Sequence, residues 1–218
     1  MTGANLSLNT GFADWKVVQT IGTSNDGLPL NTSSSAVVLT GTLPLAVNLP
    51  GFEAFAWVNP FGGAAWVGQL ASDGHFSNGG SIVCPDPTHC GATAGFYSYS
   101  LIVPSEGGGS LALSGFTGDN GVRSLTIMQD ASVLYSTAPV ITQASTTATG
   151  TINFGMGGNV VITALVENLD GPGRNPSGFI ASGSATTLPL SVPEVPNTSL
   201  IGLGIITLIA LRSRQANS

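Results

Sequence analysis

The stretch Gly95-Phe96-Tyr97-Ser98-Tyr99-Ser100-Leu101-Ile102-Val103 decides the fold class, because its side chains alternate in character. Large apolar and aromatic residues recur at every second position from Tyr97 to Val103, whereas Ser98 and Ser100 fall between them. Successive side chains of an extended chain point to opposite faces. The alternation therefore predicts a β-strand with one face on a hydrophobic core and the other towards solvent.

Similar short runs recur along the chain, and turn residues separate them. Gly107-Gly108-Gly109 predicts a loop, and the Asn-Gly pair in Gly118-Asp119-Asn120-Gly121 predicts a hairpin turn. No segment of useful length before the C-terminal region has a helical period. The expected strands span residues 15–21, 36–40, 54–58, 64–70, 96–103, 110–116, 122–128, 132–135, 150–154, 159–167 and 178–185.

The composition favours one all-β domain, an antiparallel β-sandwich over residues 1–187. Charged residues make up 7% of the chain and hydrophobic residues 42%, with 30 glycines. An average soluble domain has about 25% charged residues, and many short apolar runs between turns are typical of sandwiches. Before the C-terminal region the basic residues are Lys16, Arg123 and Arg174. Three scattered cations are too few to neutralise a nucleic-acid backbone, so we expect no nucleic-acid partner.

Two cysteines, Cys84 and Cys90, flank the sequence Pro-Asp-Pro-Thr-His. A disulfide that closes this small loop is the preferred interpretation if the chain is exported. It would stabilise the fold by roughly 2–2.5 kcal/mol in the chain-entropy view. A metal site that uses both thiolates and His89 is the alternative, although it lacks a second ligand pair. Two free thiols are the remaining possibility.

The C-terminal residues 188–218 differ in character from the rest of the chain. An extended Pro-rich linker leads to an apolar run, Leu200 to Leu211, which ends at Arg212-Ser213-Arg214. A helix over residues 198–211 would be about 21 Å long, which is short for a hydrocarbon core of about 30 Å. The run is apolar on all sides and flanked by arginines, which favours a membrane helix over a buried core helix. The positive-inside rule keeps those arginines cytoplasmic.

The order of these features resembles the PEP-CTERM sorting signal, which an exosortase of Gram-negative bacteria reads. That family's Val-Pro-Glu-Pro motif appears here as Val192-Pro193-Glu194-Val195-Pro196, with Val195 before the second proline. The resemblance implies an exported protein, held in the inner membrane by its tail and then displayed at the cell surface or released. The membrane and an exosortase are the partners that it implies. The sorting residues that it implies are Val192, Pro193, Glu194, Pro196, Arg212 and Arg214.

The N-terminal residues Met1 to Ser7 contain neither a basic n-region nor an apolar h-region. An exported domain needs a signal peptide, so we expect one to be encoded upstream of Met1 or to have been removed. In a cytosolic protein the C-terminal signal would have no role.

Several segments resemble, in their order, the lectin-like or galactose-binding-like sandwich that many PEP-CTERM proteins carry. The resemblance implies a jelly-roll or galactose-binding-like sandwich, a carbohydrate-binding role, and an exopolysaccharide partner. The segments are Asp14-Trp15, Trp57, Trp66, Gly95 to Tyr99, Asp119-Asn120, and Asn175-Pro176-Ser177-Gly178-Phe179.

Aromatic and polar residues in these segments are candidates for sugar contacts. Aromatic faces pack on sugar rings, and amides and carboxylates bind hydroxyl groups. The alternatives are a core role for the aromatic residues and a plain Asx turn for the Asp-Asn pair. We expect no cofactor, and calcium binding by Asp73, Asp86 or Asp170 has no supporting pattern. The candidates are Trp57, Trp66, Tyr97, Tyr99, Asp119 and Asn120.

No catalytic residues are predicted. The chain lacks a Gly-x-Ser-x-Gly elbow, a His-Glu-x-x-His motif and a P-loop. His75 and His89 have no nucleophile setting. Three hypotheses remain: a surface or matrix protein that binds polysaccharide, a structural envelope protein without a ligand, and a secreted glycan hydrolase that would use two facing carboxylates.

Overall fold

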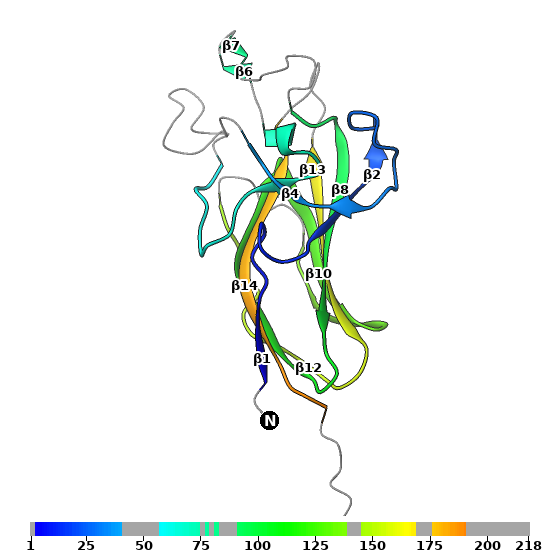
Figure 1. The fold of residues 1–218 in the computed structure, drawn as a ribbon, viewed down its shortest axis with the longest axis vertical. Coiled ribbons are helices and arrows are strands. Elements are labelled where there is room, and N and C mark those ends of the chain that lie inside the picture. The colour runs from blue at the N-terminus through cyan, green and yellow to red at the C-terminus, as the bar shows by residue number, and fades with distance from the viewer. Residues whose placement is uncertain are drawn as a thin grey trace, which may run out of the picture.

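A computed structural model describes residues 3–40, 57–74, 77–78, 81–82, 91–138, 145–168 and 176–190 (Figure 1). Two antiparallel six-stranded sheets form a β-sandwich, and a small pair of strands lies apart from them. Within the described ranges the one helical element is a 3₁₀ turn at Ala71–Gly74. None of these residues forms a helix with the length and hydropathy needed to cross a bilayer. The predicted all-β class is confirmed.

Sheet A has a long central strand, β14, that pairs with β9 along its whole length. The start of β14 pairs with β5 and its end pairs with β1, so both of its edges are occupied. The strands of this sheet are β12 (Ile152–Phe154), β9 (Gly109–Asp119), β14 (Gly178–Thr187), β5 (Val67–Gly68), β4 (Val37–Val38) and β1 (Ala4–Ser7).

Sheet B is built around β8 and β13, which pair from Gly95↔Asn168 to Pro104↔Asn159. Its strands, in order, are β11 (Ser132–Ser136), β10 (Gly121–Gln129), β13 (Asn159–Asn168), β8 (Gly95–Pro104), β2 (Lys16–Gly22) and β3 (Ser34–Ser35). The separate pair is β6 (Ser77–Asn78) and β7 (Ser81–Ile82).

Most predicted strands are confirmed, with ends that differ by at most three residues. The predicted strands 36–40 and 64–70 are reduced to the two-residue β4 and β5. The sequence did not predict β1, β3, β6 or β7. Of the predicted strand 54–58 only residues 57 and 58 lie in the described part. The expected C-terminal helix, the sorting motif and the arginine cluster lie outside it.

The predicted hairpin at Gly118-Asp119-Asn120-Gly121 is wrong. Strand β9 belongs to sheet A, where Asp119 pairs with Gly178, whereas Gly121 begins β10 of sheet B opposite Glu167. The chain therefore crosses between the sheets at this turn. A tight Asn-Gly turn suits either path, and the long partner strands β13 and β14 decide which one the chain takes.

The main core lies between the two sheets and is centred on Phe179. Its ring lies 5.2 Å from that of Trp15 in an edge contact and 5.1 Å from that of Tyr99 in a stacked contact. All three side chains are fully buried. Aromatic pairs at these distances contribute beyond the apolar area that they bury.

A second apolar cluster covers the outer face of sheet A. Ile180, next to Phe179 on β14, points to this side, where Trp57 and Trp66 lie with ring centroids 4.2 Å apart. The indole N–H of Trp66 donates to the carbonyl oxygen of Val58 at 3.0 Å. Both faces of β14 are therefore covered near its start, as its burial pattern shows.

Replacing Phe179 with Ala should lower the free energy of unfolding by about 3–5 kcal/mol, because it leaves a cavity between Trp15 and Tyr99. Phe12, which is 76% exposed, offers a matched control. The Phe12→Ala change should stay within about 0.5 kcal/mol of the parent. Urea unfolding of the three proteins measures both effects, and equal losses for the two variants would contradict the assignment of this core.

Candidate functional site

The four aromatic candidates for sugar binding all lie inside the two apolar clusters. Trp57, Trp66, Tyr97 and Tyr99 are at most 1% exposed. A ring that stacks on a sugar needs an open face, so in this structure these side chains stabilise the fold and do not form a binding surface. The Tyr97 hydroxyl donates to the carbonyl oxygen of Thr93 at 2.7 Å. This is the core role that the sequence left as the alternative.

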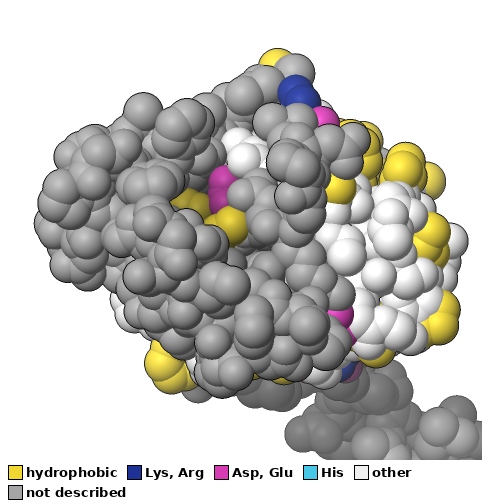
Figure 2. All heavy atoms as spheres, turned by 90° about the horizontal axis from the view of Figure 1, so that it is seen from above, with side chains coloured by type: hydrophobic (Ala, Val, Ile, Leu, Met, Phe, Trp, Pro, Cys, Tyr) yellow, Lys and Arg dark blue, Asp and Glu magenta, His cyan; other side chains and the backbone are white. Residues whose placement is uncertain are grey.

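Asp119 and Asn120 lie at the crossing between the sheets, where Asp119 pairs with the start of β14 and so lies at the opposite end from Ala4 and Thr187. Figure 2 views the molecule from this opposite end. Asp119 is buried, and the backbone N–H of Asn120 donates to the carbonyl oxygen of Glu167 at 2.6 Å. Charged side chains are few among the described atoms on this face (Figure 2). Of the aromatic candidates, Trp57 approaches the Asp119 carboxyl. The predicted set therefore does not converge on one open site.

Burial raises the pKa of the Asp119 carboxyl to about 7. The Trp57 side chain opposes this shift only in part, because its indole N–H makes no hydrogen bond of good geometry. One carboxyl oxygen, Oδ1, has no hydrogen-bond partner among the described residues. A buried carboxylate without partners is costly, so the neutral form is favoured.

A second buried carboxyl, Asp73, belongs to a polar cluster that the sequence did not predict. The Asn25 side-chain amide donates to Asp73 Oδ1 at 3.0 Å and to Gln69 Oε1 at 3.4 Å. The backbone N–H of Leu70 donates to Asp73 Oδ2 at 2.8 Å. Burial nevertheless raises the pKa of Asp73 to about 6, since desolvation outweighs these hydrogen bonds.

Ser177, which directly precedes β14, hydrogen-bonds to the backbone of both acidic residues. Its backbone N–H donates to the carbonyl oxygen of Asp73 at 2.9 Å, and its hydroxyl donates to the carbonyl oxygen of Asp119 at 3.1 Å. Both carboxyls are therefore part of the packed end of the sandwich and face no open solvent. No group of three or more metal-binding side chains gathers within the described ranges.

An open surface of a different kind lies on the outward face of sheet B. Hydroxyl side chains stand directly opposite one another across four adjacent strands, because the strand registers align them. We call this set the hydroxyl row: Ser136, Thr126, Thr163 and Ser100. Lys16 continues the row on β2, where its ammonium group contacts Asp14 at 2.7 Å and the Ser35 hydroxyl at 3.0 Å.

The rows on either side of the hydroxyl row differ from each other. One side carries the apolar row, defined as Val133, Met128, Val161 and Ile102. The other side carries Ser124, Leu165, Ser98 and Val18. Rows on one face of a strand are two residues apart, which is about 6.6 Å. The face therefore offers hydroxyl groups and small apolar surfaces in bands.

This face has few charges, so its chemistry suits a neutral partner. Beyond Lys16, the described ion pair on this sheet is Arg123 with Glu167. Hydroxyl groups both donate and accept hydrogen bonds, which matches the hydroxyl groups of a sugar. The sequence contained part of this signal, since Ser98 and Ser100 alternate with the tyrosines. The neighbours of these serines could not be read from the sequence, because they come from strands far along the chain.

No protein family matches the chain, and no curated protein matches it. It is similar to a GH2 beta-galacturonidase from Eisenbergiella tayi bound to glycerol, at 16% identity and a TM-score of 0.36, over 87% of this chain and 25% of that one. It is also similar to the K3 cleaved adhesin domain of Lys-gingipain from Porphyromonas gingivalis w83. That match has 12% identity and a TM-score of 0.32, over 56% of this chain and 83% of that one.

The chain thus spans about a quarter of the length of the galacturonidase. TM-scores this low do not establish a common fold. Several residues with a predicted role lie outside the described part of the chain, and their roles stay predictions. These residues are Cys84, Cys90, His75, His89, Asp86, Asp170 and Asn175.

The two raised pKa values predict that stability falls as the pH rises. The folded chain keeps protons on Asp73 and Asp119 that the unfolded chain releases above the usual pKa of 3.8. The free energy of unfolding should therefore fall between about pH 4 and the folded pKa values of about 6 and about 7. Each group contributes a slope of up to about 1.4 kcal/mol per pH unit. Urea unfolding at several pH values across this range measures how the free energy of unfolding changes with pH.

A variant with Asp73→Asn and Asp119→Asn should show a flatter pH dependence, because neither amide titrates. Asp14→Asn, at an exposed carboxyl, is the matched control and should keep the parent slope. A double variant that also keeps the parent slope would show that other groups titrate.

Proposed function

We propose that this chain is an exported envelope protein, sorted by an exosortase through its C-terminal signal, whose sandwich binds a neutral polysaccharide. The observation that carries the proposal is the tail sequence, Val192 to Pro196, followed by an apolar run and the Arg212/Arg214 pair. The described structure supports the division into two parts, because β14 ends at Thr187 and the chain continues to Leu190 beyond the sheets. The signal can therefore extend without unpairing a strand.

The hydroxyl row is the surface that supports polysaccharide binding. Thr126, Thr163 and Ser100 lie side by side on neighbouring strands and point outward. Single hydrogen bonds from such groups contribute only about 1 kcal/mol each. A polymer presents the same hydroxyl groups many times, so many weak contacts can add up to useful binding.

A structural envelope protein without a ligand is the second candidate. The absence of an exposed aromatic ring from the hydroxyl row favours it, since aromatic stacking supplies much of the affinity for sugars. The glycan hydrolase is the weakest of the three hypotheses. Its strongest support is the pair of carboxyls with raised pKa values, and both are buried.

Replacing Arg212 and Arg214 with Glu should impair membrane retention and processing, because the cationic end would no longer hold the tail at the cytoplasmic face. Fractionation of the bacterium that encodes the protein, followed by immunoblotting, measures the distribution. Ser114→Glu adds a charge on the other sheet of the sandwich and should leave the distribution as it is. Unchanged localisation of the double arginine variant would contradict sorting by this signal.

A Ser100→Glu, Thr163→Glu variant should lose binding to neutral polysaccharides, because two carboxylates would replace two hydroxyls at the centre of the row. Affinity electrophoresis in gels that contain neutral glycans measures this as a lost retardation. Ser114→Glu, at an exposed position of β9 on the other sheet, is the matched control. Equal retardation of all three proteins would exclude this face, and no retardation of the parent by any glycan would favour the structural role.

A further inference from the structure

Both ends of the described chain lie at the same end of the sandwich, which we call the terminal end. Ala4 on β1 pairs directly with Thr187 on β14, and the Cα atoms of such partners are about 5 Å apart. Figure 1 shows the N-terminal label and the continuation of β14 together below the sheets. Any segment attached to either side of the sandwich therefore emerges here.

The terminal end also carries exposed apolar side chains. Met156 is 70% exposed, and Leu188 and Leu190 are about half exposed. Met156 and Leu188 line the same open hollow of about 400 Å³. Ile102 and Val133, the exposed members of the apolar row, lie on the part of sheet B next to this end. Exposed apolar groups gathered at one end mark a contact surface more often than scattered ones do.

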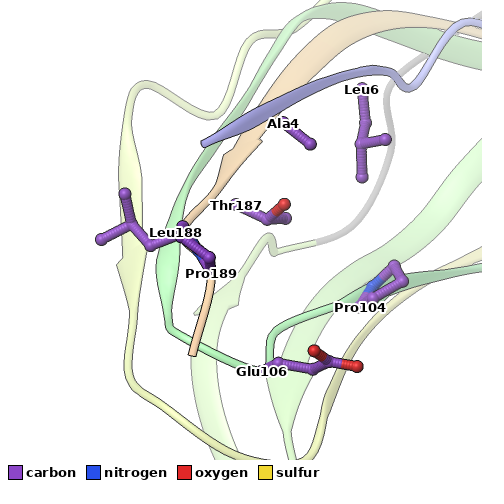
Figure 3. A pocket seen from close by; sticks show the side chains of 7 residues that line it. All are labelled: Ala4, Leu6, Pro104, Glu106, Thr187, Leu188 and Pro189. Carbon is purple, nitrogen blue, oxygen red and sulfur yellow. The ribbon is translucent and has the colours of Figure 1, made fainter. Parts of the chain in front are cut away.

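A second hollow of about 350 Å³ adjoins the first at Leu188 (Figure 3). Leu6 from β1 and Pro104 from β8 contribute apolar walls, and Glu106 contributes a carboxylate. Asp130 follows β10 at the same end, where its carboxyl lies against Gly158. The described charges here are thus acidic, which disfavours contact with an anionic surface.

We propose that the terminal end rests on the surface of a neutral phospholipid bilayer, with Met156, Leu188 and Leu190 in its interfacial layer. This inference rests on the proposed anchoring by the tail. From Leu190 the chain reaches the apolar run at Leu200 within ten residues, which span at most about 35 Å when extended. An anchored tail therefore holds the terminal end within about 35 Å of the membrane, whereas the opposite end is linked to the membrane only through the sandwich.

This orientation leaves the proposed binding face free. The strands run from the terminal end towards the opposite end, so a sandwich that rests on its terminal end holds its sheets upright. Of the three rows described above, the apolar row then lies nearest the membrane, and the hydroxyl row stands one row further out. A polysaccharide on the outer side of this membrane could reach Thr163 and its neighbours without displacing lipid.

Quenching by brominated lipid tests this orientation on the full chain. We would reconstitute a Met156→Trp variant into phosphatidylcholine vesicles, with and without brominated acyl chains. The native residues Trp15, Trp57 and Trp66 are buried and report little on lipid contact. The introduced indole should lose emission in brominated vesicles, because bromine quenches only at short range. Vesicles rich in phosphatidylglycerol should give weaker quenching.

Ile21→Trp is the matched control, since Ile21 is an exposed apolar residue at the opposite end of the sandwich. Its emission should not respond to bromine. Adding Leu188→Ser and Leu190→Ser to Met156→Trp should reduce the quenching, while the protein still floats with the vesicles. Flotation itself reports on the tail, so a chain that does not float overturns the anchoring and with it this inference.

A chain that floats but shows no quenching at position 156, or equal quenching at positions 21 and 156, overturns the orientation alone. A dimer in which the introduced indole is shielded but not quenched would mean that a second copy covers the terminal end, which also contradicts the proposal.

Discussion

The pairing of β14 is the constraint on which the rest of the structure depends. Its ladder with β9 runs from Gly178↔Asp119 to Thr187↔Gly109. Phe179 fills the main core on one side, and Ile180 meets the Trp57–Trp66 pair on the other. Because neighbouring residues of one strand anchor two apolar clusters, its register fixes both. A shift by one residue would exchange the two faces and disrupt both clusters.

The sequence predicts the strands of this fold well because the signal is local. The alternation of Tyr97, Tyr99 and Leu101 with the serines is a property of one segment, and the structure confirms it in β8. The same alternation implied that the tyrosines face the core. Strand order is not a local property. The Asn-Gly turn alone could not show that β9 and β10 belong to different sheets. The choice between a hairpin and a crossing depends on β13 and β14, which lie far along the chain.

The candidate binding face could not be predicted from the sequence either, because it depends on the pairing of distant strands. Thr126, Thr163 and Ser100 come from three strands, and only the registers place them in one row. The buried carboxyls were hidden in a different way. Asp73 and Asp119 stand among turn residues, where acidic side chains are usually solvated, and burial appears only when the 3₁₀ turn and the start of β14 pack together. For the C-terminal tail, in contrast, the order of residues alone suggested a role as a sorting signal.

The path of β14 also has a mechanical consequence if the tail is held in a membrane. A force that pulls the sandwich away from the membrane would be transmitted through Leu190 and Thr187, along the axis of β14. The hydrogen bonds to β9 and β1 lie across that axis, so the load is shared by the whole ladder in shear and no single bond is peeled first. The anchored chain would therefore resist extraction at β14, and yield sooner at strands that are pulled open from one end.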